Sequence, residues 1–250
     1  MKRRILLTAI AVTLFGQLSL FGITAEKQEK LLVDVFATRD ESKIIDKLKE
    51  WKIDPNYEFK YHGILKKKGY ILHMAVLYGL ADVLEYLIKQ GADVKKETKD
   101  KGKTALHYLA EIHVCPRRKP SFMTMAKALF KAGADENARD AYFGYTPLHS
   151  AALAIIAYKK DETRLLDYLT SQRLRQRGIS WRSDGPATDL DIRSKEGKTA
   201  MDMVCKGSKA GGKTYKGMPN SKACKLLQEK KESFDQLKTQ MFFPGLYKKK

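Results

Sequence analysis

The sequence predicts an all-α fold in which helix-turn-helix units stack into a solenoid. A short Leu-His block recurs at residues 72–75, 106–110 and 146–152. A Gly-Ala-Asp block recurs at residues 91–93 and 133–135. Between these blocks, apolar residues follow helical spacing. Recurrence of the same blocks along a chain is the signature of a repeat architecture.

Two apolar sets predict helices with one edge facing the core. They lie within residues 83–88 and 125–130 and consist of Val83, Leu84, Leu87 and Ile88, and of Met125, Ala126, Leu129 and Phe130. Small residues follow the Leu-His blocks, at Ala75, Ala110, Ala151 and Ala152. We expect helices of successive units to pack closely at these small residues.

The best-formed block runs from Gly144 through Ala152 and reads G-Y-T-P-L-H-S-A-A. Residues 102–107, which read G-K-T-A-L-H, are nearly as well formed. These blocks resemble the ankyrin repeat, whose unit is a turn, T-P-L-H-x-A-A, a helix pair and G-A-D. The resemblance implies an ankyrin-repeat solenoid of helix-turn-helix units with β-turn fingers. It also implies a non-enzymatic protein–protein interaction module.

Weaker units flank the clear blocks, so the prediction covers most of the chain. We expect a signal peptide over residues 1–25, an ankyrin-repeat domain over 26–235 and a basic C-terminal tail over 236–250. The domain is expected to hold five units: an atypical cap at 26–56, units at 66–98, 99–140 and 141–178, and an atypical cap at 194–231. Terminal repeats of a solenoid differ from the others because one of their faces has no neighbour.

The spacing departs from the ankyrin pattern. Gly91 and Gly133 are 42 residues apart, whereas an ankyrin repeat has about 33 residues. The excess falls in connections, at residues 57–68, 115–121, 180–194 and 206–220. Insertions there cost little stability, because closure entropy grows slowly with loop length. We expect residues 206–220 to form a mobile loop rich in Lys and Gly.

The N-terminus predicts export. Residues 1–4 are cationic, residues 5–23 are a nearly uncharged apolar run, and Thr24-Ala25 supplies small residues before a charged segment. This order is typical of a secretory signal peptide, and we expect cleavage after Ala25. The run is also about long enough to span a bilayer, so an uncleaved anchor is the alternative. Either way, the prediction is a secreted or periplasmic protein, and we expect a bacterial envelope.

The charge balance points to an anionic partner. The chain has 48 Lys plus Arg and 29 Asp plus Glu, a formal net charge of +19 over 250 residues. At 43% hydrophobic residues it is too apolar to be wholly disordered. A basic surface attracts acidic proteins, anionic surfaces or nucleic acid. Because no base-reading module is apparent, we expect an acidic protein partner and no specific nucleic acid.

Neither catalytic nor metal-binding residues are expected. His73, His107 and His149 recur at the repeat's own period, where the ankyrin resemblance implies hydrogen bonds to the backbone of the neighbouring turn. His107, Glu111 and His113 do not have the H-E-x-x-H spacing of a zinc site. No nucleophile-and-base constellation stands out from the repeats, so we predict no enzyme, no metal and no cofactor.

Residues 207–214 match G-x-x-x-x-G-K-T, the phosphate-binding loop of nucleotide hydrolases. That loop needs a strand before it and a helix directly after it. Here a repeat helix is expected before it, and Gly217 and Pro219 oppose a helix after it. A nucleotide-binding protein is therefore only an alternative, as is an envelope-associated binder of an anionic polymer.

Three cysteines are too few for a disulfide framework. Cys205 and Cys224 belong to the two helices of the last expected unit, so a disulfide between them is possible. Cys205 also occupies the register of Ala110 and Ala152, where a small buried side chain is the alternative role. Cys115 then lies in a polar connection.

The ankyrin resemblance places partner-binding residues on the fingers and inner helices. Tyr142, Phe143 and Tyr145 lie on one short turn, and aromatic residues are frequent binding anchors. The other expected partner-binding residues, transferred by register, are Lys66, Lys67, Leu77, Tyr78, Lys101, Lys103, Lys195 and Lys198.

One further segment has a period of two. Tyr57, Phe59 and Tyr61 alternate with Glu58 and Lys60, which predicts an extended strand with one apolar face. These aromatic residues either form an enlarged finger or cover the side of the first repeats.

Overall fold

The computed structural model describes residues 25–59, 69–114, 122–170, 189–210 and 212–242; the side chains of residues 25–28 and 237–242 are not described. The chain divides into two compact units, Met1–Ala92 and Asp93–Lys250, and each is considered by itself. The expected signal peptide, apart from Ala25, lies outside the described residues, as do the insertion at 115–121 and residues 180–188.

The first unit contains helices α2 (Ala25–Ala37), α3 (Glu41–Glu50), α4 (Ile71–Tyr78) and α5 (Ala81–Lys89). Strands β1 (Glu58–Phe59) and β2 (Gly69–Tyr70) pair antiparallel just before α4. The core includes Phe36, Ile44, Phe59 and Met74, which are fully buried. The expected strand with an apolar face is thus confirmed for residues 58–59, with Phe59 facing inward.

Helix α5 receives its N-terminal cap from another helix. Its own N-cap residue, Leu80, makes no side-chain cap hydrogen bond. Instead, Glu41 of α3 accepts hydrogen bonds from the backbone N–H groups of Asp82 and Val83 at 2.6 and 3.1 Å. A carboxylate at a helix N-terminus satisfies orphan amides and complements the helix dipole. This contact therefore ties α3 to α5.

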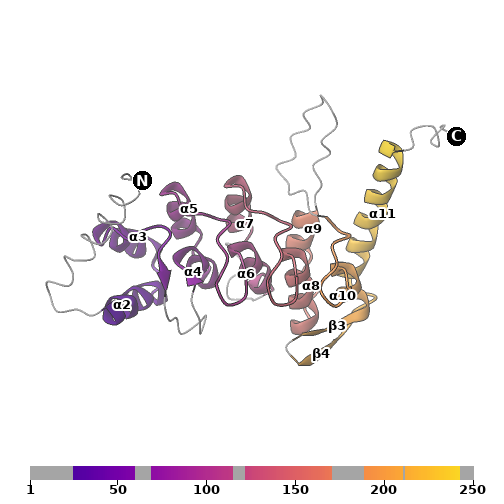
Figure 1. Ribbon diagram of the computed structural model, residues 1–250, viewed down its shortest axis with the longest axis horizontal. Helices are drawn as coiled ribbons and strands as arrows, with labels where there is room; N and C mark the ends of the chain where they lie inside the picture. Colours follow the sequence, from indigo (N-terminus) through magenta and orange to yellow (C-terminus); the bar gives the residue numbers. More distant parts are fainter. Residues whose placement is uncertain (1–24, 60–68, 115–121, 171–188, 211, 243–250) are drawn as a thin grey trace, which may run out of the picture. The chain divides into compact units, whose positions relative to one another are not determined.

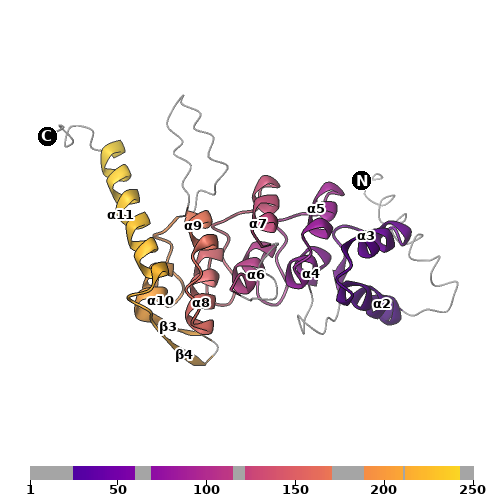
Figure 2. The same cartoon turned by 180° about the vertical axis from the view of Figure 1, so that it is seen from behind.

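The second unit contains α6 (Ala105–Ile112), α7 (Phe122–Lys131), α8 (Pro147–Tyr158), α9 (Arg164–Thr170), α10 (Ala200–Lys206) and α11 (Lys222–Phe242). Figure 1 and Figure 2 show α8 between α6 and α10 within this unit. The predicted core edge of the second apolar set is confirmed, because Met125, Ala126 and Leu129 are fully buried. The mostly helical structure fits the predicted all-α repeat fold.

Thr104, Thr146 and Thr199 begin α6, α8 and α10 as N-cap residues in extended conformation. Each takes part in a reciprocal capping box with the residue three positions later. Pro147 occupies the first turn of α8, where its missing N–H has no intrahelical partner to lose. The Leu-His blocks at residues 106–107 and 148–149 thus mark the first turns of α6 and α8, and Met201-Asp202 takes the same place in α10.

The connection after α10 differs from the expected mobile loop. Strands β3 (Gly207–Ala210) and β4 (Lys213–Lys216) form an antiparallel hairpin within residues 206–220. A Gly-Gly pair between two short segments favours such a hairpin, and Gly211-Gly212 occupies that place in the sequence. The expectation of an irregular loop was therefore wrong, because turn chemistry outweighed the low β propensity of Gly and Lys.

Helix α11 runs through Phe242, beyond the expected domain boundary at residue 235. Residues 222–242 contain no Gly or Pro, and the first helix-breaking residue after them is Pro244. The N-terminus of α11 is capped by Asp161, which accepts from the N–H groups of Lys222 and Ala223 at 2.6 and 2.9 Å. In the described residues no helix has the length and apolar character needed to cross a bilayer.

Candidate functional site

Three turns of the second unit are built alike, although the last of them is one residue shorter. We name them finger A (residues 98–104), finger B (140–146) and finger C (194–199). Each is closed by a backbone hydrogen bond near its base: Thr98 N to Lys103 O at 2.9 Å, Asp140 N to Tyr145 O at 2.8 Å, and Ser194 N to Lys198 O at 2.9 Å. Each also holds a glycine at positive φ, namely Gly102, Gly144 and Gly197.

Neighbouring fingers are joined through main-chain atoms. The N–H of Ala141 donates to the carbonyl of Lys101 at 2.8 Å, which links finger B to finger A. The N–H of Lys195 donates to the carbonyl of Phe143, also at 2.8 Å, which links finger C to finger B. The three fingers therefore form one connected edge along the second unit.

The repeat histidines carry this connection into the helices. The Thr104 backbone N–H donates to His107 Nδ1 at 3.2 Å, so Nδ1 is the acceptor and Nε2 carries the proton. His107 Nε2 then lies 2.9 Å from the carbonyl oxygen of Tyr145 in finger B. His149 Nε2 lies 3.0 Å from the carbonyl oxygen of Lys198 in finger C in the same way. The predicted structural role of these two histidines is confirmed.

Burial keeps these imidazoles neutral. Desolvation lowers the pKa of His107 to about 4 and outweighs its hydrogen bond to the Tyr145 carbonyl. Desolvation lowers the pKa of His149 as well. Each neutral imidazole uses its N–H in a hydrogen bond to a backbone carbonyl, and both side chains are buried. Both histidines therefore have a structural role.

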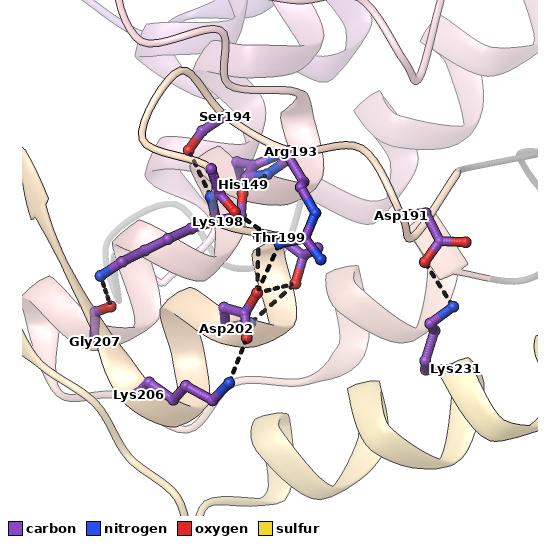
Figure 3. Close-up of polar contacts among 11 residues, drawn as sticks. His149, Asp191, Arg193, Ser194, Lys198, Thr199, Asp202, Lys206, Gly207 and Lys231 are labelled. Atoms are coloured by element: carbon purple, nitrogen blue, oxygen red, sulfur yellow. Dashed lines mark hydrogen bonds and ion pairs between the residues drawn. The ribbon is translucent and has the colours of Figure 1, made fainter.

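Asp202 takes the histidine position in the last unit, which the sequence analysis did not single out. It accepts from Thr199 N at 3.2 Å and from the Thr199 hydroxyl at 3.0 Å. The same oxygen, Oδ2, lies 3.8 Å from Arg193, and the other oxygen, Oδ1, pairs with Lys206 at 2.9 Å (Figure 3). The pKa of Asp202 is lowered, since the hydrogen bonds and charge of its partners outweigh partial burial. This polar ending is what a terminal repeat requires.

The aromatic residues of finger B split into two groups. Tyr142 is 65% exposed, and its ring meets that of Phe143 edge-on at 4.6 Å. Tyr145, by contrast, is 2% exposed and stacks between Phe143 and His149, at 5.0 and 5.7 Å. The prediction that Tyr145 is a partner-binding anchor is therefore wrong, because its ring fills the base of the finger.

The predicted cations also differ in availability. Lys101 is exposed at the tip of finger A. Lys103 is not free to meet a partner, because its ammonium pairs with Glu111 and lies over the Tyr108 ring. Lys195 donates to the Ala141 carbonyl at 2.6 Å, and Lys198 donates to the Gly207 carbonyl at 2.6 Å. These last two lysines hold the fingers and the hairpin in place.

The remaining predicted residues belong to the first unit. Lys66 and Lys67 lie outside the described residues. Leu77 and Tyr78 are buried, with exposed fractions of 8% and 7%, and the Tyr78 ring lies 6.2 Å from that of Phe36. Their expected role in partner binding was wrong, because α2 packs against the end of α4.

A family comparison bears on these repeats. Residues 72–166 match the family described as ankyrin repeats (3 copies). This finding supports an ankyrin-repeat protein. Ankyrin repeats are generally protein–protein interaction modules and are typically non-enzymatic. The matched residues include fingers A and B together with His107 and His149.

The phosphate-loop motif does not adopt the phosphate-binding arrangement. Residues 207–210 and 213–216 are the two strands of the hairpin, and no helix begins at Lys213 or Thr214. Backbone N–H groups at a helix N-terminus, which bind the phosphates in such loops, are thus not presented here. In the described residues no group of three or more His, Cys, Asp or Glu is placed to hold a metal ion.

A small pocket of about 130 Å³ lies beside Asp202 and is lined by Leu148, Leu190, Met201 and Leu227. Its charged rim is engaged in ion pairs, with Lys231 2.6 Å from Asp191 (Figure 3). Ligand pockets usually exceed about 300 Å³. This pocket is therefore smaller than a typical small-molecule site.

Proposed function

We propose that this protein is a non-enzymatic interaction module that is exported across the cytoplasmic membrane and binds an acidic protein partner through its fingers. The ankyrin match over residues 72–166 supports the class of function. The single observation that supports the site is the exposed ring of Tyr142 at the tip of finger B.

Tyr142 is exposed yet held by a rigid neighbour. Phe143, against which its ring packs, has its N–H bonded to Asp140 Oδ1 at 2.8 Å and its carbonyl bonded to Lys195 N. A large aromatic side chain on a fixed backbone loses little conformational entropy on binding. Lys101 on the adjacent finger would favour acidic groups and raise the association rate.

Export is supported by two independent features. The first is the cationic start, apolar run and small residues that precede Glu26. The second is the disulfide between Cys205 and Cys224, whose Cα atoms are 5.3 Å apart. Disulfides form and persist in oxidising compartments, such as the periplasm or the cell exterior.

The test compares two exposed tyrosines. Tyr142→Ser removes the proposed anchor, and Tyr158→Ser removes a ring of similar exposure, 63%, at the end of α8. Crosslinking and pull-down from an envelope fraction would identify a partner, and titration would give its affinity for each variant. We expect Tyr142→Ser to weaken binding by about 2 kcal/mol and Tyr158→Ser to leave it unchanged.

Equal affinity of the two variants for the captured partner would overturn the assignment of finger B. Release of the protein from an anionic polymer at moderate salt, with no dependence on Tyr142, would instead favour the anionic-polymer alternative.

A further inference from the structure

The β3–β4 hairpin is a built element of the last repeat. A Cβ on Gly207 would lie 2.4 Å from the Tyr215 carbonyl oxygen, and one on Gly217 would lie 2.5 Å from that of Cys205. Gly207 also has φ 92° and ψ 170°, a region open essentially to glycine alone. The Cys205–Cys224 disulfide joins the helices from which the hairpin leaves and to which it returns. The base of the hairpin is therefore fixed in two ways. The backbone at Gly207 and Gly217 lies in close contact with the backbone opposite it, and the disulfide links α10 to α11.

The two faces of the hairpin differ. Residues alternate between faces along a strand, and Ser208 and Ala210 on one face are buried. Ser208 donates to Glu196 of finger C at 3.4 Å. On the opposite face, Lys209, Thr214 and Lys216 are exposed. The hairpin therefore lies against the finger side of its unit and presents a basic face to solvent.

The two edges of the hairpin differ as well. Ala210 pairs with Lys213 across residues 211–212, so this pair and the Ser208–Tyr215 pair are the hydrogen-bonded pairs. The backbone groups of Gly207, Lys209, Thr214 and Lys216 then point away from the partner strand. On the β3 edge the two carbonyl oxygens already accept hydrogen bonds: Lys198 Nζ donates to Gly207 O at 2.6 Å, and the Tyr145 hydroxyl donates to Lys209 O at 3.5 Å.

The β4 edge carries Thr214 and Lys216, and within the described residues β3 is the only strand that pairs with β4. An edge strand with outward N–H and C=O groups can accept a further strand. The surrounding sequence is strongly basic, because residues 203–228 contain six lysines and no acidic residue. Lys213 and Lys216 of β4 are exposed, as is Lys209, which lies opposite Thr214 on β3.

We propose that the β4 edge binds an extended acidic segment of a protein partner by strand addition. Thr214 and Lys216 supply main-chain hydrogen bonds, and the three lysines select carboxylate side chains. The unpaired N–H and C=O groups favour a peptide over nucleic acid, because a phosphate backbone has no N–H donors to match them. This inference rests on the proposed interaction function and adds a second contact beside the fingers.

The experiment titrates full-length protein into a fluorescent peptide of alternating Val and Glu and measures anisotropy. Thr214→Pro removes the outward N–H without cutting a bond between β3 and β4, and Thr214→Ala is the matched control that keeps this N–H. We expect Thr214→Pro to weaken binding about tenfold and Thr214→Ala to bind like the unchanged protein. Lys213→Glu with Lys216→Glu should also weaken binding, and raised salt should act in the same direction.

A peptide N-methylated at alternate residues provides a second test that leaves the protein untouched. Loss of binding on N-methylation supports strand addition even if Thr214→Pro disturbs the hairpin. Equal binding of the methylated and unmethylated peptides would overturn the proposal, as would an absence of binding by either. Equally tight binding of oligo(dT) that is insensitive to Thr214→Pro would show a general polyanion surface instead. None of these outcomes changes the Tyr142 test, so the two proposals fail separately.

Discussion

At the scale of single residues, the position three residues after the capping threonine holds different residues in different repeats: His107, His149 and Asp202. His107 and His149 each satisfy a threonine cap with one ring nitrogen and the next finger with the other. Asp202 satisfies the same kind of cap with Oδ2, which also lies near Arg193, and pairs with Lys206 through Oδ1. An aspartate has no donor for a further carbonyl. The substitution therefore marks where the row of fingers ends.

The buried histidines predict acid sensitivity. The pKa of His107 falls from 6.5 in the unfolded chain to about 4 in the folded protein. The unfolded state therefore binds a proton that the folded state refuses, so stability is lost as pH falls from about 6.5 through 4. The loss attributable to His107 is up to about 3 kcal/mol. Urea unfolding at a series of pH values would measure it.

His107→Gln is the variant that tests this assignment. We expect lower stability at pH 7, by about 1–3 kcal/mol, because the Tyr145 carbonyl loses one of its two donors or keeps it in poorer geometry. We also expect a shallower decrease between pH 6.5 and 4. An unaltered pH dependence in the variant would contradict the claim that His107 contributes to acid sensitivity.

At the scale of elements, the helices could be predicted from the sequence where the repeat pattern is clear. The Leu-His blocks and helical spacing predicted α6, α8 and the core edge of α7, because these depend on contacts local to one unit. The role of Tyr145 was missed, since its burial depends on His149 and on the hairpin backbone at Lys209. The cap that Asp161 gives α11 was missed for the same reason, because Asp161 is separated in the sequence from Lys222 and Ala223 by 61 and 62 positions.

The disulfide predicts how firmly the last repeat is held. Cys205 and Cys224 are 19 residues apart in sequence, and a loop of that size gives about 3 kcal/mol of stabilisation in the chain-entropy description. We expect Cys205→Ser with Cys224→Ser to lose about that amount in urea unfolding. Reductant should destabilise the original protein and have no further effect on the double variant. Equal stability of the two without reductant would show that the link contributes little.

At the scale of the whole molecule, the N-terminal residues bear on both the net charge and the proposed export. Removal of residues 1–25 takes away three basic residues and no acidic residue, so most of the +19 charge belongs to the remaining chain. We expect intact-mass analysis of protein from the periplasm or medium to find Glu26 as the first residue. Recovery of a chain that still begins at Met1, in the membrane fraction, would support the uncleaved anchor.

The hydrogen bonds between neighbouring fingers determine which substitutions these turns can tolerate. They run from Ala141 N to Lys101 O and from Lys195 N to Phe143 O, and both use atoms that every non-proline residue possesses. The side chains at the tips, Lys101 and Tyr142 among them, contribute nothing to those two bonds. A substitution of Lys101 or Tyr142 should therefore leave these two main-chain links between the fingers in place, whereas a substitution of Lys195 also removes its side-chain hydrogen bond to the Ala141 carbonyl.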